Sequence, residues 1–168
     1  MAVEMTRTRK LPAMSRRPKL KVLSAAPDAS AATGYVLDDQ IGFLLRIAMQ
    51  RHTSIFMSQM IGDLTQTQFA ALAKLLEVGP CSQNHLGRLI YLDASTIKGV
   101  VDRLQLRGLV ATCDDPNDRR RRAVTLTDKG RRTTQSAIEI AAKITHKTLA
   151  PLTGEEQRAV LKLLRKLS

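Results

Sequence analysis

The segment from residue 110 to residue 126 restricts the possible folds of this chain more than any other. Two short β-prone stretches, Val110 to Cys113 and Ala123 to Leu126, flank the turn-forming sequence D-D-P-N-D and four consecutive arginines. Turn residues between two such stretches predict a β-hairpin. Because helical patterns precede and follow it, we expect a mainly α protein that carries one small hairpin.

Capping signals divide the rest of the chain into helices. Thr65 with Gln68 and Thr153 with Glu156 have the spacing of capping boxes. Ser82, Asp93 and Thr127 are further expected N-cap residues. Helices are expected from Asp38 to about Gln59, from Thr65 to Gly79, from Ser82 to about Ile90, from about Ala94 to Arg107, from Thr127 to about Leu149, and from Thr153 onward. Two helices joined by a tight turn and followed by a hairpin describe a winged helix-turn-helix.

The charge of the chain points to an anionic partner. The 168 residues suffice for one domain with a core, and their formal net charge is +12. Residues 1–33 hold seven Lys or Arg against two acidic residues, and the remainder is basic as well. We expect a flexible basic arm over 1–33, which either adds nonspecific phosphate contacts or has no role. Nucleic acid is the first partner to consider and an anionic membrane surface the second.

Several protein classes are disfavoured. Cys81 and Cys113 are too few for a disulfide framework, which fits a reducing cytoplasm. Neither a membrane-spanning apolar run nor a secretory h-region is present. The scattered His52, His85 and His146 form no metal motif, and no catalytic triad or phosphate-binding loop is found. We therefore expect no enzyme activity, no metal and no cofactor.

The helix over residues 94–107 has the pattern of a DNA-reading helix. Ile97, Val100, Val101 and Leu104 share one face, and the other face carries short polar side chains with basic residues at its edges. A major groove admits such a helix. Gly99 costs about 1 kcal/mol of helix stability relative to Ala, which close approach to DNA explains. The alternative is an ordinary amphipathic helix.

The four arginines suit the tip of a wing. Side chains alternate along a strand, so Arg119 and Arg121 share one face, and Arg120 and Arg122 share the other. An arginine on a thin hairpin can enter a narrow minor groove while its neighbours hold phosphates. Asp115 and Asp118 are expected to brace one or two of the arginines. The alternative is a solvated charge run.

At this point the sequence resembles the MarR family of bacterial transcriptional regulators. The motifs that carry the resemblance are L-T-x-x-Q at Leu64–Gln68, G-P-x-S-Q at Gly79–Gln83, D-x-S-T-x-x-x-V-V-D-R-L at Asp93–Leu104, R-G-L-V at Arg107–Val110, and D-P-x-D-R-R followed by L-T-x-K-G ending at Gly130. The resemblance covers about residues 38–168. It implies a cytoplasmic, nucleoid-associated homodimeric repressor of a pseudo-palindromic operator, with no membrane partner.

The resemblance also implies domain limits and DNA-contacting residues. A MarR-type domain would occupy 34–168, with a winged lobe at about 64–127 and dimerisation helices at about 38–60 and 128–168. The residues that would contact DNA are Ser95, Thr96, Lys98 and Gly99 in the major groove, Arg103 and Ser82 with Gln83 at the backbone, and Arg119, Arg120, Arg121 and Arg122 in the wing. The run of four arginines exceeds the family's D-R-R pattern, so which arginine enters the groove stays open.

The first long helix suggests a ligand. Gly42, Arg46, Met49, Gln50 and Thr53 lie on one face of a very apolar helix. We expect Arg46 to bind the carboxylate of a small aromatic acid while Phe43, Phe69 and Leu72 pack its ring. The alternative is that Arg46 pairs with an acidic residue across the dimer.

The motif set also resembles the branch that regulates aromatic-acid breakdown, including nicotinate-type repressors, which implies a hydroxynicotinate or a hydroxybenzoate as effector. Two other functions are compatible with the sequence. One is a nonspecific architectural protein that binds DNA or RNA, although few aromatics are available for base stacking. The other is a redox-responsive regulator acting through Cys81, for which a small buried cysteine is the competing interpretation.

Overall fold

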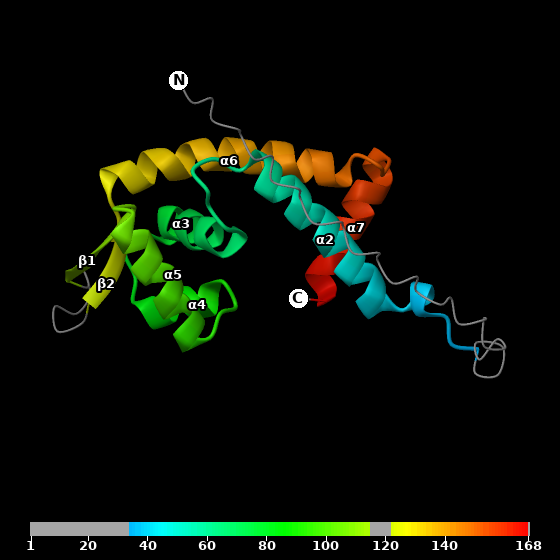
Figure 1. Cartoon of the computed structure of the whole chain (residues 1–168), viewed down its shortest axis with the longest axis horizontal. Coiled ribbons are helices and arrows are strands. Elements are labelled where there is room, and N and C mark those ends of the chain that lie inside the picture. Colours follow the sequence, from blue (N-terminus) through cyan, green and yellow to red (C-terminus); the bar gives the residue numbers. More distant parts are fainter. Residues whose placement is uncertain (1–33, 115–121, 168) are drawn as a thin grey trace, which may run out of the picture. The chain divides into compact units, whose positions relative to one another are not determined.

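The computed structural model describes residues 34–114 and 122–167. The chain separates into two compact units, Met1–Asp39 and Gln40–Ser168. The described part of the first unit holds a short 3₁₀ helix, η1 (Leu37–Asp39). The second unit contains α2 (Ile41–Gln59), α3 (Gln66–Val78), α4 (Gln83–Leu89), α5 (Ala94–Leu106), β1 (Val110–Asp114), β2 (Arg122–Leu126), α6 (Asp128–Leu149) and α7 (Gly154–Leu167) (Figure 1). The predicted mainly helical fold with one hairpin is confirmed.

The predicted helix caps are present. Thr65 and Gln68 form a reciprocal capping box at the start of α3, and Thr127 Oγ1 accepts from Gly130 N at the start of α6. Thr153 and Glu156 make the second box, with Thr153 N donating to Glu156 Oε2 over 2.8 Å. Hydrogen bonds from Thr153 lower the pKa of Glu156 below its usual value.

The predicted start of the first long helix was wrong by three residues. Asp38 and Asp39 belong to η1, and α2 begins at Ile41. Its N-cap residue, Gln40, makes no side-chain capping hydrogen bond. The negative charges of Asp38 and Asp39 favour a helix start nearby. They do not determine the first residue of the helix, because that residue is defined by backbone hydrogen bonds.

A compact core holds α3, α4, α5 and the hairpin together. Leu72, Leu86, Ile97 and Leu104 are completely buried. The strands pair in antiparallel register from Val110 opposite Leu126 to Asp114 opposite Arg122. Gly108 has a φ of +66°, which lets the chain turn sharply between α5 and β1. The hairpin is thereby fixed directly after α5.

The hairpin gains a further pairing from residue 81. The backbone of Cys81 forms an isolated antiparallel bridge with Val124, and the hydrogen bond from Val124 N to Cys81 O is 2.8 Å long. Cys81 is buried, and it is not joined to Cys113 in a disulfide. The interpretation of Cys81 as a small buried cysteine is confirmed.

Helix α6 links the two ends of the second unit. Figure 1 shows it running from β2 to α7, and it contacts both α3 and α2. Among the helices of the described residues, none has both the length and the hydropathy of a membrane span.

The apolar surfaces of α2 and α7 remain uncovered. Phe56 is the buried residue of α2, and α7 has none. Most side chains of α2 are exposed in the single chain, although the helix contacts α6. The exposed apolar side chains of the two helices are Ile41, Leu44, Leu45, Ile47, Met49, Met57, Leu161, Leu163, Leu164 and Leu167.

Candidate DNA-binding surface and effector pocket

Helix α5 presents the residues predicted to read DNA on its exposed side. Ile97, Val100, Val101 and Leu104 are buried in the core. Ser95, Thr96, Lys98 and Arg103 are exposed, and Gly99 is half-buried between them. The structure therefore brings together the five α5 residues that the sequence singled out.

Asp93 organises the beginning of this surface. Its Oδ1 accepts from Ser95 N and Thr96 N, each over 2.9 Å, and from Ser95 Oγ over 2.6 Å. Its Oδ2 accepts from Thr96 Oγ1 over 2.6 Å. The hydrogen bonds from Ser95 and Thr96 hold the pKa of Asp93 well below its usual range. Sequence reasoning identified Asp93 as a helix cap but missed its hold on the two hydroxyls.

The middle of the surface is open enough for close approach. Lys98 Nζ donates to Asp102 Oδ2 over 2.6 Å, one turn along the helix. A methyl group at Gly99 would meet only the Arg103 guanidinium, at 3.5 Å or more. Among the residues that the structure describes, none therefore requires glycine at position 99.

Arg107 fixes the other end of α5. Its guanidinium donates to Gln68 Oε1 over 3.2 Å and to the carbonyl oxygen of Gly62. Lys129 Nζ in turn donates to the carbonyl oxygen of Arg107 over 2.9 Å. The sequence analysis named Arg107 only as the first residue of the R-G-L-V motif and predicted no structural role for it. The partner residues lie 22 to 45 positions away, so this anchoring was not readable from local pattern.

At the base of the wing, Arg122 pairs with Asp114, and the predicted braces Asp115 and Asp118 remain untested. Arg122 Nη1 donates to Asp114 Oδ1 over 2.7 Å, between paired positions of the two strands. Arg119, Arg120 and Arg121 lie outside the described residues, as do Asp115 and Asp118.

The first turn of α4 carries the two remaining predicted contacts. Ser82 and Gln83 are both half-buried. Ser82 Oγ accepts from His85 N over 3.3 Å, so Ser82 acts as the N-cap of this short helix.

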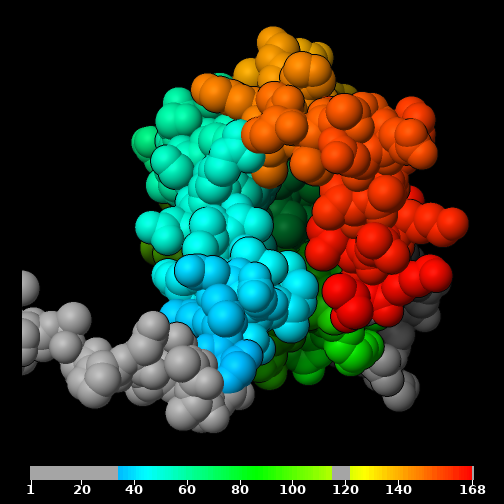
Figure 2. All heavy atoms as spheres, turned by 90° about the vertical axis from the view of Figure 1, so that its right-hand side faces the viewer, coloured from blue at the N-terminus to red at the C-terminus, as the bar shows by residue number. Residues whose placement is uncertain are grey.

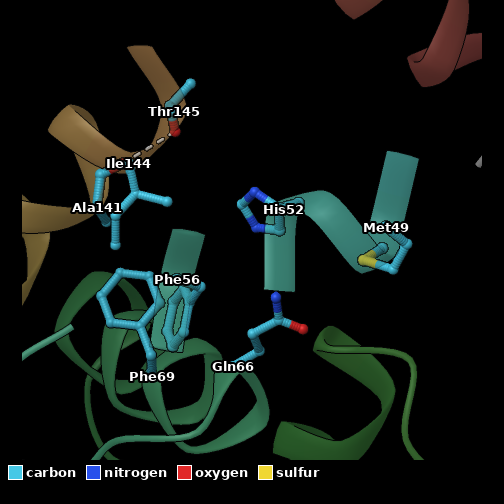
Figure 3. Close-up of a pocket in the computed structure, with 8 residues that line it drawn as sticks. All are labelled: Met49, His52, Phe56, Gln66, Phe69, Ala141, Ile144 and Thr145. Carbon is cyan, nitrogen blue, oxygen red and sulfur yellow. Dashed lines mark hydrogen bonds between the residues drawn. The ribbon is translucent and has the colours of Figure 1, made fainter. Parts of the chain in front are cut away.

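A small aromatic pocket lies between α2, α3 and α6. Its volume is about 330 Å³, and Figure 3 shows the rings of Phe56 and Phe69 beneath Ala141 and Ile144. The ring centroids of Phe56 and Phe69 are 6.1 Å apart, and that of His52 is 6.3 Å from Phe56. The lining residues are Met49, His52, Phe56, Gln66, Phe69, Ala141, Ile144 and Thr145. Its size and aromatic walls suit one small flat ring.

A larger hollow separates α2 from α7, and we call it the α2–α7 hollow. Its volume is about 820 Å³, and Figure 2 shows it between the cyan α2 and the red α7, under the end of α6. Leu45, Leu161 and Leu164 are among its aliphatic walls. Met49 and His52 line both this hollow and the aromatic pocket, so the two cavities adjoin there.

Three nitrogen-bearing side chains face the α2–α7 hollow. Arg51 Nη1 donates to Thr148 O over 2.7 Å, and His52 Nδ1 lies 2.9 Å from Thr148 Oγ1. The Arg46 guanidinium stands 5.0 Å from the centroid of the Phe43 ring. Among the described residues, no carboxylate pairs with Arg46. Arg46 is thus a cation at an apolar hollow without an anionic partner in that part of the chain.

The predicted effector residues are distributed over both cavities. Gly42, Arg46 and Met49 line the α2–α7 hollow, and Phe69 lines the aromatic pocket together with Met49. The remaining four, Phe43, Gln50, Thr53 and Leu72, line neither; Thr53 accepts from Gln66 Nε2 over 3.4 Å, and Leu72 is fully buried.

The sequence analysis did not identify three of the residues that line the aromatic pocket, His52, Phe56 and Gln66. Met49, His52 and Phe56 recur at helical spacing, and this spacing was the sequence signal that could have identified His52 and Phe56 on α2.

The described residues hold no cluster of three or more metal-binding side chains.

Comparison with known proteins identifies the family. A MarR family profile matches residues 62–121. The HTH-type transcriptional repressor NicR of Pseudomonas putida is 41% identical over 136 residues, which cover 80% of this chain and 86% of NicR. The chain belongs to the MarR family. It is thus a DNA-binding transcriptional repressor of that family and not an enzyme.

Solved structures agree with the family. A probable transcriptional regulator from Pseudomonas aeruginosa is 48% identical, with a TM-score of 0.76 over 79% of this chain and 100% of that one. BpsR of Bordetella bronchiseptica is 39% identical, with a TM-score of 0.74 over 79% of this chain and 96% of BpsR, and its DNA binding is regulated by 6-hydroxynicotinic acid. The resemblance of this MarR-family chain to the aromatic-acid and nicotinate branch is confirmed.

Proposed function

We propose that this repressor binds a pseudo-palindromic operator as a homodimer and releases it when a small aromatic carboxylate binds. The observation that carries the DNA-binding half is the exposed side of α5, where small polar side chains, two cations and an unexplained glycine stand beside an arginine-bearing wing. The effector half rests on the aromatic pocket that adjoins the hollow containing Arg46.

In this proposal α5 enters the major groove. Ser95, Thr96, Lys98 and Gly99 lie against base edges, and Arg103, Ser82 and Gln83 lie near phosphates. The wing arginines, Arg119 to Arg122, approach the adjacent minor groove and backbone. Since two copies present two α5 helices, the half-sites are expected about 10 bp apart centre to centre.

The homodimer is supported by the uncovered apolar surface. Four of the exposed apolar residues of α2 and α7 line the α2–α7 hollow of about 820 Å³, namely Leu45, Met49, Leu161 and Leu164. A monomer that exposes such a surface would associate, because burial of apolar area is favourable at about 25 cal/mol per Å². A second copy supplies matching apolar helices and also pairs the two reading helices.

The effector chemistry follows from the two adjoining cavities. The ring of an aromatic acid packs against Phe56 and Phe69 in the aromatic pocket, and its carboxylate extends past Met49 and His52 toward Arg46. A carboxylate supplies the anionic partner that Arg46 lacks in the described part of the chain. The regulation of BpsR by 6-hydroxynicotinic acid supports this ligand class.

A mobility-shift assay tests the function as a whole. The full-length chain is expected to shift the promoter beside its own gene, to resist scrambled competitor, and to release the DNA when 6-hydroxynicotinate or a hydroxybenzoate is added. Equal competition by scrambled DNA would instead support a nonspecific architectural protein. Release by an oxidant that is abolished in Cys81→Ser would support the redox alternative.

Arg46→Ala is expected to raise the effector concentration needed for operator release by about 10- to 100-fold, the effect of losing one charge-assisted hydrogen bond. Operator affinity without effector should stay within about twofold of wild type. The control is Lys74→Ala, which removes a cation that pairs with exposed Glu77 on α3. Calorimetric titration with each acid gives the dissociation constant. Unchanged effector binding by Arg46→Ala would remove Arg46 from the ligand site.

Gly99→Ala is expected to raise the stability of the protein and to lower its affinity for the operator. The added methyl group meets no described residue closer than 3.5 Å, so the helix should gain up to about 1 kcal/mol of stability. The same methyl group faces the operator, and affinity should fall at least about tenfold if the backbone approaches base edges closely. Thermal unfolding and mobility shift measure the two effects. A more stable variant with wild-type operator affinity would show that Gly99 does not approach DNA.

A further inference from the structure

Asp93, Ser95 and Thr96 form one hydrogen-bonded unit at the exposed start of α5. Both hydroxyl oxygens lie 2.6 Å from the carboxylate, Ser95 Oγ from Oδ1 and Thr96 Oγ1 from Oδ2. Two backbone N–H groups also donate to Oδ1 over 2.9 Å. All three side chains are exposed and none contributes to the core. Capping the helix requires the backbone bonds, but it does not require the two hydroxyl bonds.

The direction of the two hydroxyl bonds is fixed by chemistry. An ionised carboxylate only accepts, because it carries no hydrogen. The bonds from Ser95 and Thr96 lower the pKa of Asp93, which keeps it ionised at neutral pH. Each hydroxyl has a single hydrogen, so each has committed its hydrogen to Asp93. What the two hydroxyls still offer to another molecule is lone pairs.

This commitment decides what they can contact on DNA. Phosphate oxygens accept hydrogen bonds, so they cannot bond to an oxygen that has only lone pairs to offer. The donors on base edges in the major groove are the N6 amino group of adenine and the N4 amino group of cytosine. We propose that Ser95 and Thr96 read the operator as acceptors from adenine or cytosine amino groups, and that Asp93 is the positioning residue that imposes this specificity.

Two further arguments favour Ser95 and Thr96 as acceptors of hydrogen bonds from DNA. If either hydroxyl rotated to donate to a phosphate, the carboxylate would lose a charge-assisted bond of 2.6 Å, one of the stronger hydrogen bonds in proteins. In addition, the exposed negative charge of Asp93 repels phosphates and attracts amino groups. The cations Lys98 and Arg103 occupy the same side of α5 and are available as donors. The inference rests on the proposed placement of α5 in the major groove.

The first experiment tests the DNA. An operator is selected from random duplexes with the full-length chain, and the base pairs that α5 protects are mapped. At each protected adenine, purine replaces the base and removes the N6 amino group. We expect a loss of affinity of about 3- to 10-fold at one or two positions, the effect of one hydrogen bond. Pyrimidinone replaces cytosine in the same way, and 7-deaza bases, which remove the N7 acceptor, are expected to have no effect at those positions.

The second experiment tests Asp93. Asn caps helices as well as Asp does, so Asp93→Asn should keep the fold. The amide nitrogen of Asn donates a hydrogen bond where the carboxylate oxygen accepted one. The hydroxyl that faces this nitrogen must therefore accept, and its own hydrogen becomes available to donate to DNA. Selection with Asp93→Asn should then change one base from adenine or cytosine to guanine or thymine, which present acceptors. The control is Glu77→Gln, which removes an exposed carboxylate on α3 and leaves both hydroxyls and Lys98 unchanged.

The outcomes separate this inference from the proposed function. If no specific sequence is selected by wild type, the proposed function fails. If a sequence is selected but removal of amino groups at the α5 positions leaves the affinity unchanged, the acceptor reading is overturned. Thr96→Val, which keeps the shape and removes the hydroxyl, should become insensitive to one amino group even if Asp93→Asn fails to fold. Retained sensitivity in that variant would also overturn the inference.

Discussion

Gly130→Ala is expected to destabilise the chain by more than about 3 kcal/mol and to abolish operator binding. A Cβ atom at this position would stand 1.8 Å from the backbone oxygen of Leu109 and 2.8 Å from its carbonyl carbon. Because both atoms belong to the backbone, no side-chain rotation relieves the overlap. The first turn of α6 would have to separate from the loop that links α5 to β1.

The same contact explains why the loss would extend to DNA binding. Thr127 N donates to Leu109 O over 3.1 Å, and Thr127 Oγ1 donates to Gly108 O over 2.7 Å. These bonds join the end of β2 to the end of α5, so displacing α6 also displaces the wing relative to the reading helix. We expect the midpoint of thermal unfolding to fall by about 6 °C or more, since about 1 kcal/mol corresponds to roughly 2–8 °C for domains of this size range.

Circular dichroism melts of Gly130→Ala and Gly99→Ala provide a matched pair. Both variants add one methyl group to a helical glycine, but only position 130 has no room for it. A wild-type melting temperature for Gly130→Ala would mean that α6 can move away from Leu109 at no cost, and would contradict the close packing described above.

Much of the winged lobe was predictable because its signals are local. The capping box of Thr65 and Gln68, the cap at Asp93 and the turn chemistry between β1 and β2 each depend on residues within a few positions of one another. Such patterns specify helix ends and hairpins before any tertiary contact forms. The candidate DNA-contacting residues of α5 were predictable for the same reason, since the helical period places them on a single exposed side.

What the sequence did not reveal depends on residues far apart in the chain. The aromatic pocket combines Met49 from α2, Phe69 from α3 and Thr145 from α6, so no single helical pattern identifies it. The anchoring of Arg107 by Gly62 and Gln68 and the close approach of Gly130 to Leu109 are likewise tertiary. The pair of Arg122 with Asp114 depends on strand register, which places the two residues opposite each other.

Leu164→Glu is expected to convert the proposed homodimer to a monomer and to lower operator affinity at least about 100-fold. Leu164 lines the α2–α7 hollow beside Leu45 and Leu161, and 42% of its surface is exposed in the single chain. If a second copy covers this hollow, the substitution places an unpaired carboxylate in an apolar interface, which costs several kcal/mol. A monomer holds one reading helix and can engage only one half-site.

Sedimentation velocity and mobility shift measure the two expected losses, and circular dichroism verifies that the variant remains helical. Lys162→Glu is the control, because Lys162 is exposed on the same helix but does not line the α2–α7 hollow. It should remain dimeric and keep specific binding, with at most the affinity loss that follows from a change in net charge. If Leu164→Glu stays dimeric and binds the operator like wild type, the two copies must associate through another surface, and the exposed leucines of α7 would require a different partner.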